Sequence, residues 1–312
     1  MKSISEEKLR QFLNLTWLRP EVSLFQVFRS DALRHVKFLS PSLDISCGDG
    51  LTMFVHLGGI LDVNFDCFQS TRAKEFKHLS FKDIYDVYDK KKYNVKIVKK
   101  PKVKIDYGTD WKQSLLDKAS KIGLYRKLLL HDNNKIPLPF PNSCFKTIFS
   151  NSIYWVKNVE DLLLDIHRIT RSDGVVVIQV MTPYLFDTLD RLAPHIGGKA
   201  LAILGRKRRQ TMPGGQHSYK EWSRIILKSG FCIENAWNTI PSKLVIDVWN
   251  VGLRPVAHLL IQMSEALSNT ERQRIKKEWV DIFFELLKPF LSLKDTYSME
   301  RAPYVSFKLV KK

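Results

Sequence analysis

The chain has 312 residues, of which 44% are hydrophobic, and its formal net charge at pH 7 is +18. A chain of this length and apolar content can bury a sizeable core in one large domain or in a domain with an elaboration, which excludes a predominantly disordered protein. The excess of positive charge makes RNA, acidic lipid headgroups and phosphorylated metabolites candidate partners, and charge alone does not choose among these anions.

Cysteine usage and the first residues indicate a compartment. The four cysteines are widely spaced, with no CxxC pair and no histidine cluster at metal-ligand spacing, which predicts a reducing compartment and no bound metal. The segment MKSISEEKLR is charged where a signal peptide is apolar, and no uninterrupted apolar run approaches the roughly 20 residues that span a bilayer. We therefore expect a soluble cytoplasmic protein without an integral membrane segment.

Residues 1–40 are predicted to form a helical brace ahead of the core. A turn at Leu18–Glu21 interrupts the helical pattern, and the apolar residues Val22, Phe25 and Phe28 follow the turn at helical spacing.

The core, residues 41–183, begins with a short strand that runs into glycines and then alternates strand-like and helix-like patterns. Its last strand, Val175–Val180, is almost wholly apolar, as expected for a strand that helices cover on both faces of a parallel sheet. The alternation predicts a three-layer α/β fold with a doubly wound, mostly parallel sheet. The other predicted elements are a helix at Gln113–Lys121, strands at Leu128–Leu130 and Thr147–Phe149, and a helix at Glu160–Thr170 that Asn158 caps and Ser172–Gly174 ends.

Residues 184–312 are expected to complete the sheet. Phe231–Ile240 and Tyr304–Val310 have strand-like patterns. Between them, residues 242–300 are helical in character and rich in tryptophan, leucine and basic side chains. We expect this helical insertion to cover the mouth of an active site.

Polar clusters follow four of the predicted strands. Glycines directly after a strand let the backbone turn tightly and approach a ligand, and an acid at a strand's end can accept hydrogen bonds from a charged amino group or a hydroxyl. Sheets of this kind bind ligands at the carboxyl ends of neighbouring strands, so the four clusters predict one site. The clusters are Asp44–Gly50, Gly108–Trp111, His131–Asn134 and Ser150–Ser152.

In their order along the chain, the segments DISCGDG, GTDWKQSLLDKASK, HDNNKIPLPFPNSCFKTIFSNSIYWV and DIHRITRSDGVVVIQV resemble class I S-adenosylmethionine-dependent methyltransferases. The similarity is to the small-molecule group that includes the ubiquinone and menaquinone biosynthesis methyltransferases. It covers roughly Pro41–Pro183, and the combination is more specific than any one motif. The resemblance implies a Rossmann-like fold, S-adenosyl-L-methionine as cofactor, and methyl transfer as the reaction.

The resemblance also implies which residues bind the cofactor. In the family the glycine loop binds the methionine part, the acid after the second strand binds the ribose, and the acid after the third strand binds the adenine. In this chain these roles fall on Asp44, Gly48 and Gly50, on Asp110, and on Asp132. The neighbouring candidates for the same cleft are Ser46, Cys47, Trp111, Asn133 and Asn151.

Two departures from the family pattern bear on this assignment. Ser46 stands where the family most often has glycine, a change that requires an unstrained backbone at this position. Gly50 and Asp110 are also unusually far apart, so an insertion lies between the first and second strands. Ile60–Phe65, which is followed by Asp66, is a rival second strand, and we favour Asp110 because a family-like helix follows it directly.

No residue is a confident catalytic base. His217 is a weak candidate because it lies after the fifth strand, where related small-molecule enzymes present polar groups to the substrate. Tyr154 is a second weak candidate, since it follows the fourth strand and either forms an aromatic side of the site or packs in the core. The fourth strand ends in SNSIYW and lacks the Asn/Asp-Pro-Pro-Tyr/Phe signature of exocyclic-amine methyltransferases. No Pro-Cys nucleophile follows it, and the absence of a GxGxxG fingerprint argues against a nicotinamide-dependent dehydrogenase.

The leading hypothesis is methylation of a small-molecule, lipid-linked or glycan-linked acceptor. An RNA methyltransferase is the alternative enzyme, favoured by the net charge and by the basic clusters Lys90–Lys104 and Arg206–Arg209. A non-catalytic scaffold that binds S-adenosylmethionine is the alternative from another class. The apolar stretch Ala200–Leu204 ahead of Arg206–Arg209 also leaves peripheral membrane contact open.

Overall fold

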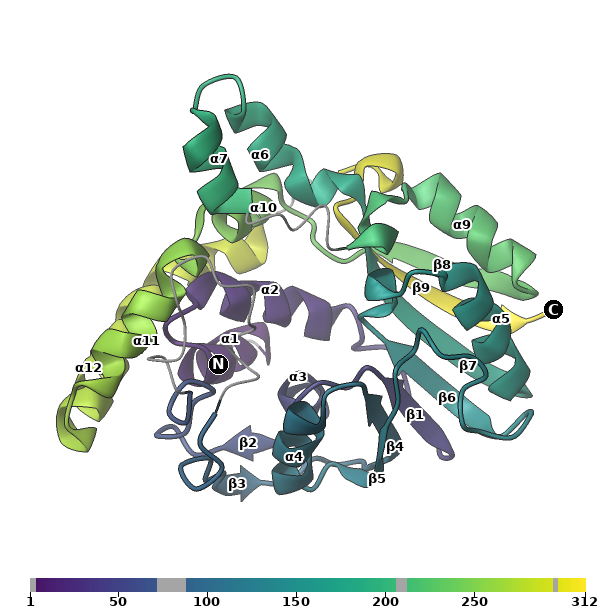
Figure 1. Cartoon of the computed structure of the whole chain (residues 1–312), viewed down its shortest axis with the longest axis horizontal. Coiled ribbons are helices and arrows are strands. Elements are labelled where there is room, and N and C mark those ends of the chain that lie inside the picture. The colour runs from purple at the N-terminus through teal and green to yellow at the C-terminus, as the bar shows by residue number, and fades with distance from the viewer. Residues whose placement is uncertain (1–3, 72–87, 206–211, 294–296) are drawn as a thin grey trace.

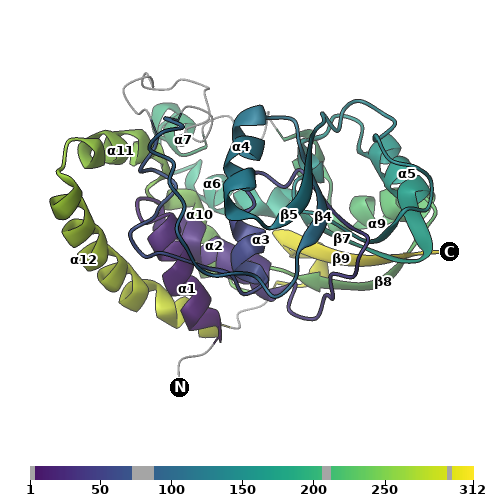
Figure 2. The same cartoon turned by 90° about the horizontal axis from the view of Figure 1, so that it is seen from below.

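The computed structural model describes residues 4–71, 88–205, 212–293 and 297–312. A seven-stranded sheet forms the centre, with helices on both faces (Figure 1). One face carries α3 (Leu51–His56) and α4 (Gln113–Ile122), and the other carries α5 (Val159–Ile169) and α9 (Tyr219–Lys228), as the view from below also shows (Figure 2). The predicted three-layer α/β fold is therefore confirmed.

The strand order places a topological switch point at β1. Across the sheet the order is β5-β4-β1-β6-β7-β9-β8, and β1 pairs in parallel with both β4 and β6. The chain thus builds one side of the sheet from β1 and then returns to build the other. β9 pairs antiparallel with β7 and β8, and the other four strand pairs of the described main sheet are parallel, so the sheet is mostly parallel, as predicted. The strands are β1 (Ser42–Ile45), β4 (Ile105–Asp110), β5 (Tyr125–Leu130), β6 (Phe145–Ser150), β7 (Thr170–Met181), β8 (Phe231–Asn238) and β9 (Tyr304–Lys311).

Apolar patterning and one N-cap residue account for the helix α5 and the strand β7 that follows it. The side chain of Asn158 accepts a hydrogen bond from Asp161 N, as expected of an N-cap residue. The predicted apolar face of the helix is buried, and so is most of the predicted strand. The predicted C-terminus of the helix is wrong, because α5 ends at Ile169 and Thr170 already pairs with Phe145 in the sheet.

Two N-terminal helices, α1 (Ile4–Leu15) and α2 (Pro20–Asp31), lie beside the sheet. Pro20 stands in the first turn of α2, where its missing N–H is tolerated. Phe25 and Phe28 are buried, as their spacing predicts. α2 contacts α3 on one side and α10 (Lys243–Val251) on another, and α1 contacts α12 (Asn269–Leu287). The N-terminal helices therefore lie between the sheet and the C-terminal helices (Figure 1).

The predicted insertion between the first two strands of the main sheet is present. The rival second strand is reduced to β2 (Ile60–Leu61), which pairs with β3 (Ile97–Lys99) in a separate two-stranded sheet. The neighbour of β1 in the main sheet is β4, which ends at Asp110.

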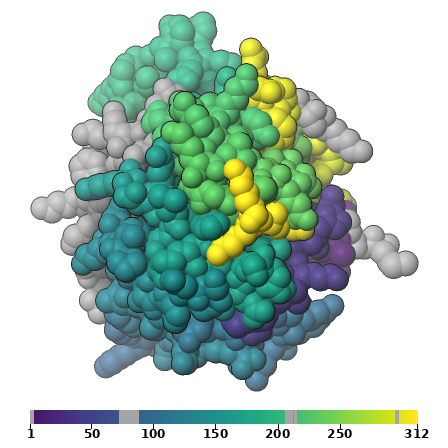
Figure 3. All heavy atoms as spheres, turned by 90° about the vertical axis from the view of Figure 1, so that its right-hand side faces the viewer, coloured from purple at the N-terminus to yellow at the C-terminus, as the bar shows by residue number. Residues whose placement is uncertain are grey.

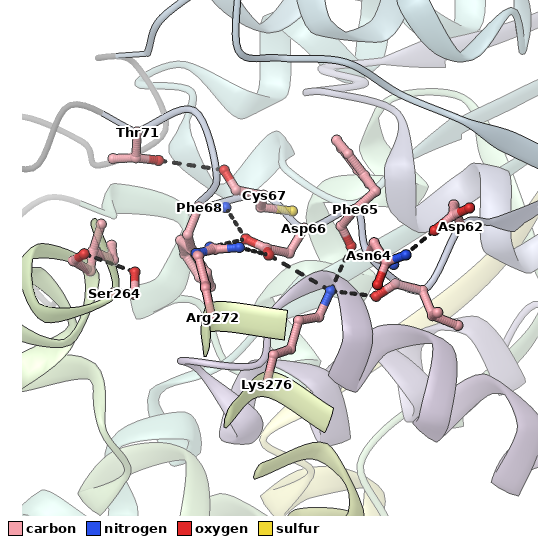
Figure 4. A network of polar contacts seen from close by, with 12 residues as sticks. Asp62, Asn64, Phe65, Asp66, Cys67, Phe68, Thr71, Ser264, Arg272 and Lys276 are labelled. Carbon is pink, nitrogen blue, oxygen red and sulfur yellow. Dashed lines mark hydrogen bonds and ion pairs between the residues drawn. The ribbon is translucent and has the colours of Figure 1, made fainter. Parts of the chain in front are cut away.

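Asp66, the rival acid, lies in a buried ion-pair network that joins the insertion to α12 (Figure 4). Its two carboxylate oxygens accept hydrogen bonds from Arg272 at 2.7 and 3.0 Å, and Lys276 Nζ lies 3.7 Å away. Lys276 also donates to the carbonyl oxygens of Val63 and Phe65, and burial lowers the pKa of its ammonium group to about 8. Asp66 thus has a structural role, because it links two parts of the chain that are distant in sequence.

The C-terminal part is mostly helical between the strands that complete the sheet. Among the described residues, Lys243–Glu265 is long and apolar enough, by length and composition alone, to span a bilayer. In the fold it is divided into α10, the 3₁₀ helix η5 (Arg254–Val256) and α11 (Ala257–Glu265), with Gly252 between them. The predicted basic cluster Arg206–Arg209 lies outside the described residues. The remaining helices are η2 (Ile153–Trp155), η3 (Pro183–Phe186), α6 (Asp187–Leu192), α7 (Gly198–Gly205), η4 (Pro213–Gln216), η6 (Lys288–Ser292) and η7 (Met299–Arg301).

Candidate functional site

A cavity of about 170 Å³ lies at the switch point of the sheet. Its lining comes from the loop after β1, from β6 and β7, and from helices α2 and α3. Five of the ten predicted cofactor-binding residues line it, and these are Asp44, Ser46, Cys47, Gly48 and Asn151. The cavity therefore lies where doubly wound sheets bind ligands, outside the carboxyl ends of the strands at the switch.

The glycine loop is built from left-handed backbone. Ser46, Gly48 and Gly50 have φ angles of 58°, 61° and 74°. The expectation of an unstrained backbone at Ser46 is wrong, because this conformation costs a residue with a Cβ about 1 kcal/mol. A hydrogen bond of 2.7 Å from Asn133 Nδ2 to Ser46 Oγ helps to hold the serine in place. The loop thus keeps a glycine-like path although its first left-handed residue is a serine.

The two glycines of the loop face different surroundings. A Cβ added at Gly50 would lie 2.7 Å from Tyr125 Cε2 and 2.9 Å from Ile122 Cδ1, so packing excludes a side chain there. A Cβ added at Gly48 would have no heavy atom of the described part of the chain within 4 Å. Gly50 therefore permits close packing against the protein, whereas Gly48 leaves open space beside the backbone for a ligand.

Asp44 is a buried carboxyl group at the end of β1. Burial raises its pKa to about 7, against the opposing effect of a 2.6 Å hydrogen bond from Tyr125 Oη to Asp44 Oδ2. The charge of Arg29 also acts to lower this pKa. A carboxyl group held in this way can release its proton near neutral pH and then accept hydrogen bonds from a cationic ligand.

Asp110 joins the second strand of the site to the glycine loop. Gly48 N donates to Asp110 Oδ2 at 3.0 Å, and Lys112 N donates to Asp110 Oδ1 at 3.0 Å. Burial raises the pKa of Asp110, while both backbone hydrogen bonds act to lower it. Each oxygen of a carboxylate has two acceptor positions, so each keeps capacity for one further donor such as a ribose hydroxyl.

The other predicted residues surround this centre without lining the cavity. Trp111 is 62% exposed directly after Asp110, with Lys112 Nζ lying 5.1 Å from its ring centroid. Asp132 Oδ1 accepts two hydrogen bonds from Asn134, and the backbone one is the main cause of its lowered pKa. Asn133 is buried and contacts Ser46, and its Oδ1 has no hydrogen-bond partner among the described residues. The polar ends of β4 and β5 are thus presented on the same side as the glycine loop.

The two weak catalytic candidates lie outside the cavity lining. The ring of His217 packs edge-on against Trp222 at 5.3 Å. Tyr154 is 8% exposed and packs against Tyr304 with ring centroids 6.1 Å apart. These contacts are those of packing side chains, and neither residue is assigned a proton-transfer role.

The cavity also contains polar residues that the sequence analysis missed. Gln26, Arg29 and Ser30 enter it from α2, His56 from α3 and Gln179 from β7. Ser30 Oγ lies 3.1 Å from His56 Nδ1, and burial lowers the pKa of this imidazole to about 4. The sequence signal that could have indicated these residues is a set of polar side chains beside the apolar stripe of the second N-terminal helix. Among the described residues, no group of three or more His, Cys, Asp or Glu side chains is arranged to hold a metal ion.

No protein-family model and no curated protein matches the chain. Among solved structures it is similar to an S-adenosylmethionine-dependent methyltransferase of Thermotoga maritima, a possible histamine N-methyltransferase (13% identity, 92% of this chain and 89% of that chain, TM-score 0.49). It is also similar to an S-adenosylmethionine-dependent methyltransferase of Mesorhizobium loti (12%, 91% and 97%, 0.45) and to the [4+2]-cyclase SpnF (10%, 91% and 81%, 0.46). At these identities and TM-scores the similarities assign no reaction to the chain.

Proposed function

We propose that the protein transfers a methyl group from S-adenosyl-L-methionine to an acceptor. The observation that carries the proposal is the 3.0 Å hydrogen bond from Gly48 N to the carboxylate of Asp110. It brings together two of the segments that the family resemblance assigns to the cofactor, at the carboxyl ends of β1 and β4. This is the edge of a doubly wound sheet at which ligands bind.

The residues present fit this cofactor. Asp44 offers a carboxyl group inside the cavity for a cationic group, and the open space at Gly48 leaves room for a ligand beside the backbone. Asp110 retains acceptor capacity for hydroxyl groups. Trp111 and Asp132 follow the ends of β4 and β5, where an exposed ring and a carboxylate suit an adenine.

When bound, S-adenosylmethionine supplies an electrophilic methyl group on a sulfonium. The protein's own contribution is positioning, because an in-line displacement depends mainly on the alignment of its partners. The hydrogen bond from Gly48 N to Asp110 Oδ2 holds the glycine loop against the end of β4. Asp44, when ionised in its buried setting, favours positive charge nearby.

The acceptor proposed is a small molecule or a small acceptor group on a lipid or glycan. A cavity of about 170 Å³ is below the 300 to 1,000 Å³ typical of sites for drug-sized ligands, so only a small group enters it beside the glycine loop. A hydroxyl acceptor needs a base with a pKa near the working pH. His56 lines the cavity, but burial lowers its pKa to about 4, so it is a weak base and is assigned no proton transfer.

Calorimetric titration with S-adenosylhomocysteine tests the proposal. Wild-type protein should bind the ligand, and Asp110→Ala should bind it at least tenfold more weakly, because a charge-assisted hydrogen bond contributes roughly 1.5–3 kcal/mol. Asp281→Asn is the matched control, because Asp281 is an exposed acid whose partner is Arg10. The proposal would be refuted if neither the wild type nor Asp281→Asn binds S-adenosylhomocysteine although both proteins are folded.

RNA is the second acceptor class that a specific observation favours. An open surface groove of about 670 Å³ is lined by Lys220, Arg224 and Lys228, which recur at helical spacing on α9. Figure 3 shows this side of the molecule, which carries α9 and the C-terminal strand. Three cations along an apolar floor suit a single-stranded polyanion.

Fluorescence anisotropy with single-stranded RNA tests this second candidate. If all three cations contact phosphates, the affinity should fall roughly tenfold or more between about 50 and 200 mM salt. Arg224→Glu should abolish binding, while Lys121→Glu, an exposed change of the same charge on α4, should weaken it only slightly. Equal losses in the two variants would show that net charge, and not the groove, attracts the RNA.

A further inference from the structure

Helix α7 has a composition that is unusual for its place in the fold. Its sequence GKALAILG carries five consecutive apolar side chains, yet all eight of its residues are exposed or half-buried. Figure 1 shows α7 at the periphery of the molecule, away from the central sheet. A helix that is apolar around its whole circumference is normally enclosed by protein or by lipid, so the described part of the fold leaves an apolar surface open at α7.

A second apolar surface adjoins α7. α7 contacts α10 and η5, and η5 leads directly into α11. Val256, Leu259 and Met263 recur at helical spacing along η5 and α11, and these residues are 41%, 47% and 66% exposed. Because residues three and four positions apart lie on one face of a helix, they form a continuous stripe. Together, α7 and this stripe make up the apolar face of the molecule.

The segment Lys243–Glu265, which contains the stripe, belongs partly to the core. It is divided at Gly252, and 33% of its most apolar stretch is buried inside the fold. Ile246 of α10 and Ile261 of α11 are fully buried. The inner sides of both helices are therefore occupied by protein contacts, so in this fold the segment can lie on a bilayer surface but cannot span a bilayer.

The charge around α7 favours an anionic surface. Residues 191–220 contain seven lysines and arginines and no aspartate or glutamate. One of the seven, Lys199, is exposed in the first turn of α7. The acids of α10 and α11 are Asp247, which forms an ion pair with Arg191, and Glu265, at the end of α11. Anionic headgroups attract such a group of cations, while apolar side chains enter the boundary between headgroups and acyl chains.

We propose that the apolar face docks the protein on a bilayer that contains anionic lipid. The apolar side chains of α7 and α11 enter the outer part of the bilayer, and the cations beside them contact lipid phosphates. This inference goes beyond methyl transfer and does not rest on it. Docking agrees with the lipid-linked acceptors of the proposed function, because it brings the protein to the surface that holds such acceptors.

Flotation of the full chain with lipid vesicles, without any adenosyl ligand, tests the inference. The wild type should float with vesicles of phosphatidylcholine and phosphatidylglycerol, float much less with phosphatidylcholine alone, and bind more weakly as salt is added. Leu259→Gln should lower the affinity about tenfold, because it removes a leucine side chain from the bilayer. Leu164→Gln is the matched control and should leave the affinity unchanged, because Leu164 is 51% exposed on α5, which lies far from α7 in both views (Figures 1 and 2).

A second pair of variants tests the electrostatic part. Lys199→Glu should lower the affinity for the mixed vesicles about tenfold or more, because a cation beside the bilayer is replaced by an anion. Lys121→Glu makes the same change of charge at an exposed position on α4 and should have a smaller effect.

Other results overturn the inference. A wild type that does not float with the mixed vesicles at low salt excludes docking. Equal losses in the two leucine variants, or in the two lysine variants, show that net charge attracts the vesicles without the apolar face. If the protein binds single-stranded RNA but not vesicles, and Lys199→Glu weakens that binding, α7 serves RNA and not lipid.

Thermal unfolding checks that each variant is folded. Should Leu259→Gln fail to fold, Met263→Gln replaces it on the same stripe, and wild-type affinity in that variant counts against docking through α11. Because these measurements use no adenosyl ligand, their outcome is independent of the calorimetric test of the proposed function.

Discussion

Asp44 combines burial with a pKa of about 7, against 3.8 for an unperturbed aspartate. Between about pH 4 and 7 the folded protein keeps a proton that the unfolded chain loses, so this residue lowers stability as pH rises through that window. Asp44→Asn removes the effect. The variant should therefore gain on the order of 1–3 kcal/mol relative to wild type between pH 5 and pH 8, measured by urea unfolding at both values. A difference between variant and wild type that is the same at both pH values contradicts this account of Asp44.

Gly48 and Gly50 form a matched pair for separating binding from packing. Both have positive φ, so an alanine at either position bears a similar backbone strain of about 1 kcal/mol. Only at Gly50 does the new methyl group collide with Tyr125 and Ile122. Gly50→Ala should therefore lower the free energy of unfolding by about 1–3 kcal/mol more than Gly48→Ala.

The affinity for the ligand should fall more in Gly48→Ala than in Gly50→Ala, the reverse of the order for stability. Gly48→Ala places a methyl group in the space proposed for the cofactor, so it should weaken S-adenosylhomocysteine binding tenfold or more while the fold stays intact. Equal stability losses in the two variants would contradict the packing role of Gly50, and unchanged affinity in Gly48→Ala would argue against the assignment of the space at Gly48 to a ligand.

The Asp66 network joins two elements, because hydrogen bonds from Arg272 to Asp66 connect α12 to the insertion after α3. Arg272→Met leaves a fully buried carboxylate with Lys276 as its remaining cationic neighbour in the network, which should cost about 3–5 kcal/mol of unfolding free energy. Arg274→Met on the same helix is the control, because Arg274 pairs with Glu278 at the surface and its loss should change stability by less than about 1 kcal/mol. Similar losses in the two variants would contradict a structural role for the pair.

The elements of the core could be predicted from the sequence because their patterning is local. The apolar run in β7, the amphipathic α5 with its Asn158 cap, and the helix after Asp110 are each specified by neighbours in the chain. The end of α5 was mispredicted because Thr170 enters the sheet, and pairing with β6 is a tertiary contact that local patterning does not contain.

The site could be predicted only in part for the same reason. The loop after β1 and Asp110 follow strands, so their placement at one edge of the sheet follows from topology. Arg29 and Gln179 come together where β7 contacts α2, and the left-handed backbone at Ser46 is held by Asn133, 87 residues away in sequence. No pattern within one segment reports such contacts.

Considered as a whole, the molecule encloses the switch point between its sheet and its N-terminal helices, which the C-terminal helices contact in turn. Asp44 and Arg29 line the same cavity, and Asp110 holds the glycine loop beside it, although the three residues belong to separate segments. The cytoplasmic location and the division at residues 40 and 183 stay predictions of the sequence.

A crystal structure of the protein with S-adenosylhomocysteine tests the central claim most directly. The account predicts ligand density across the carboxyl ends of β1 and β4, with the ribose hydroxyls within hydrogen-bond distance of Asp110 and the adenine beside Trp111 and Asp132. Density for the ligand at any other place, or a ribose that contacts neither oxygen of Asp110, would contradict it.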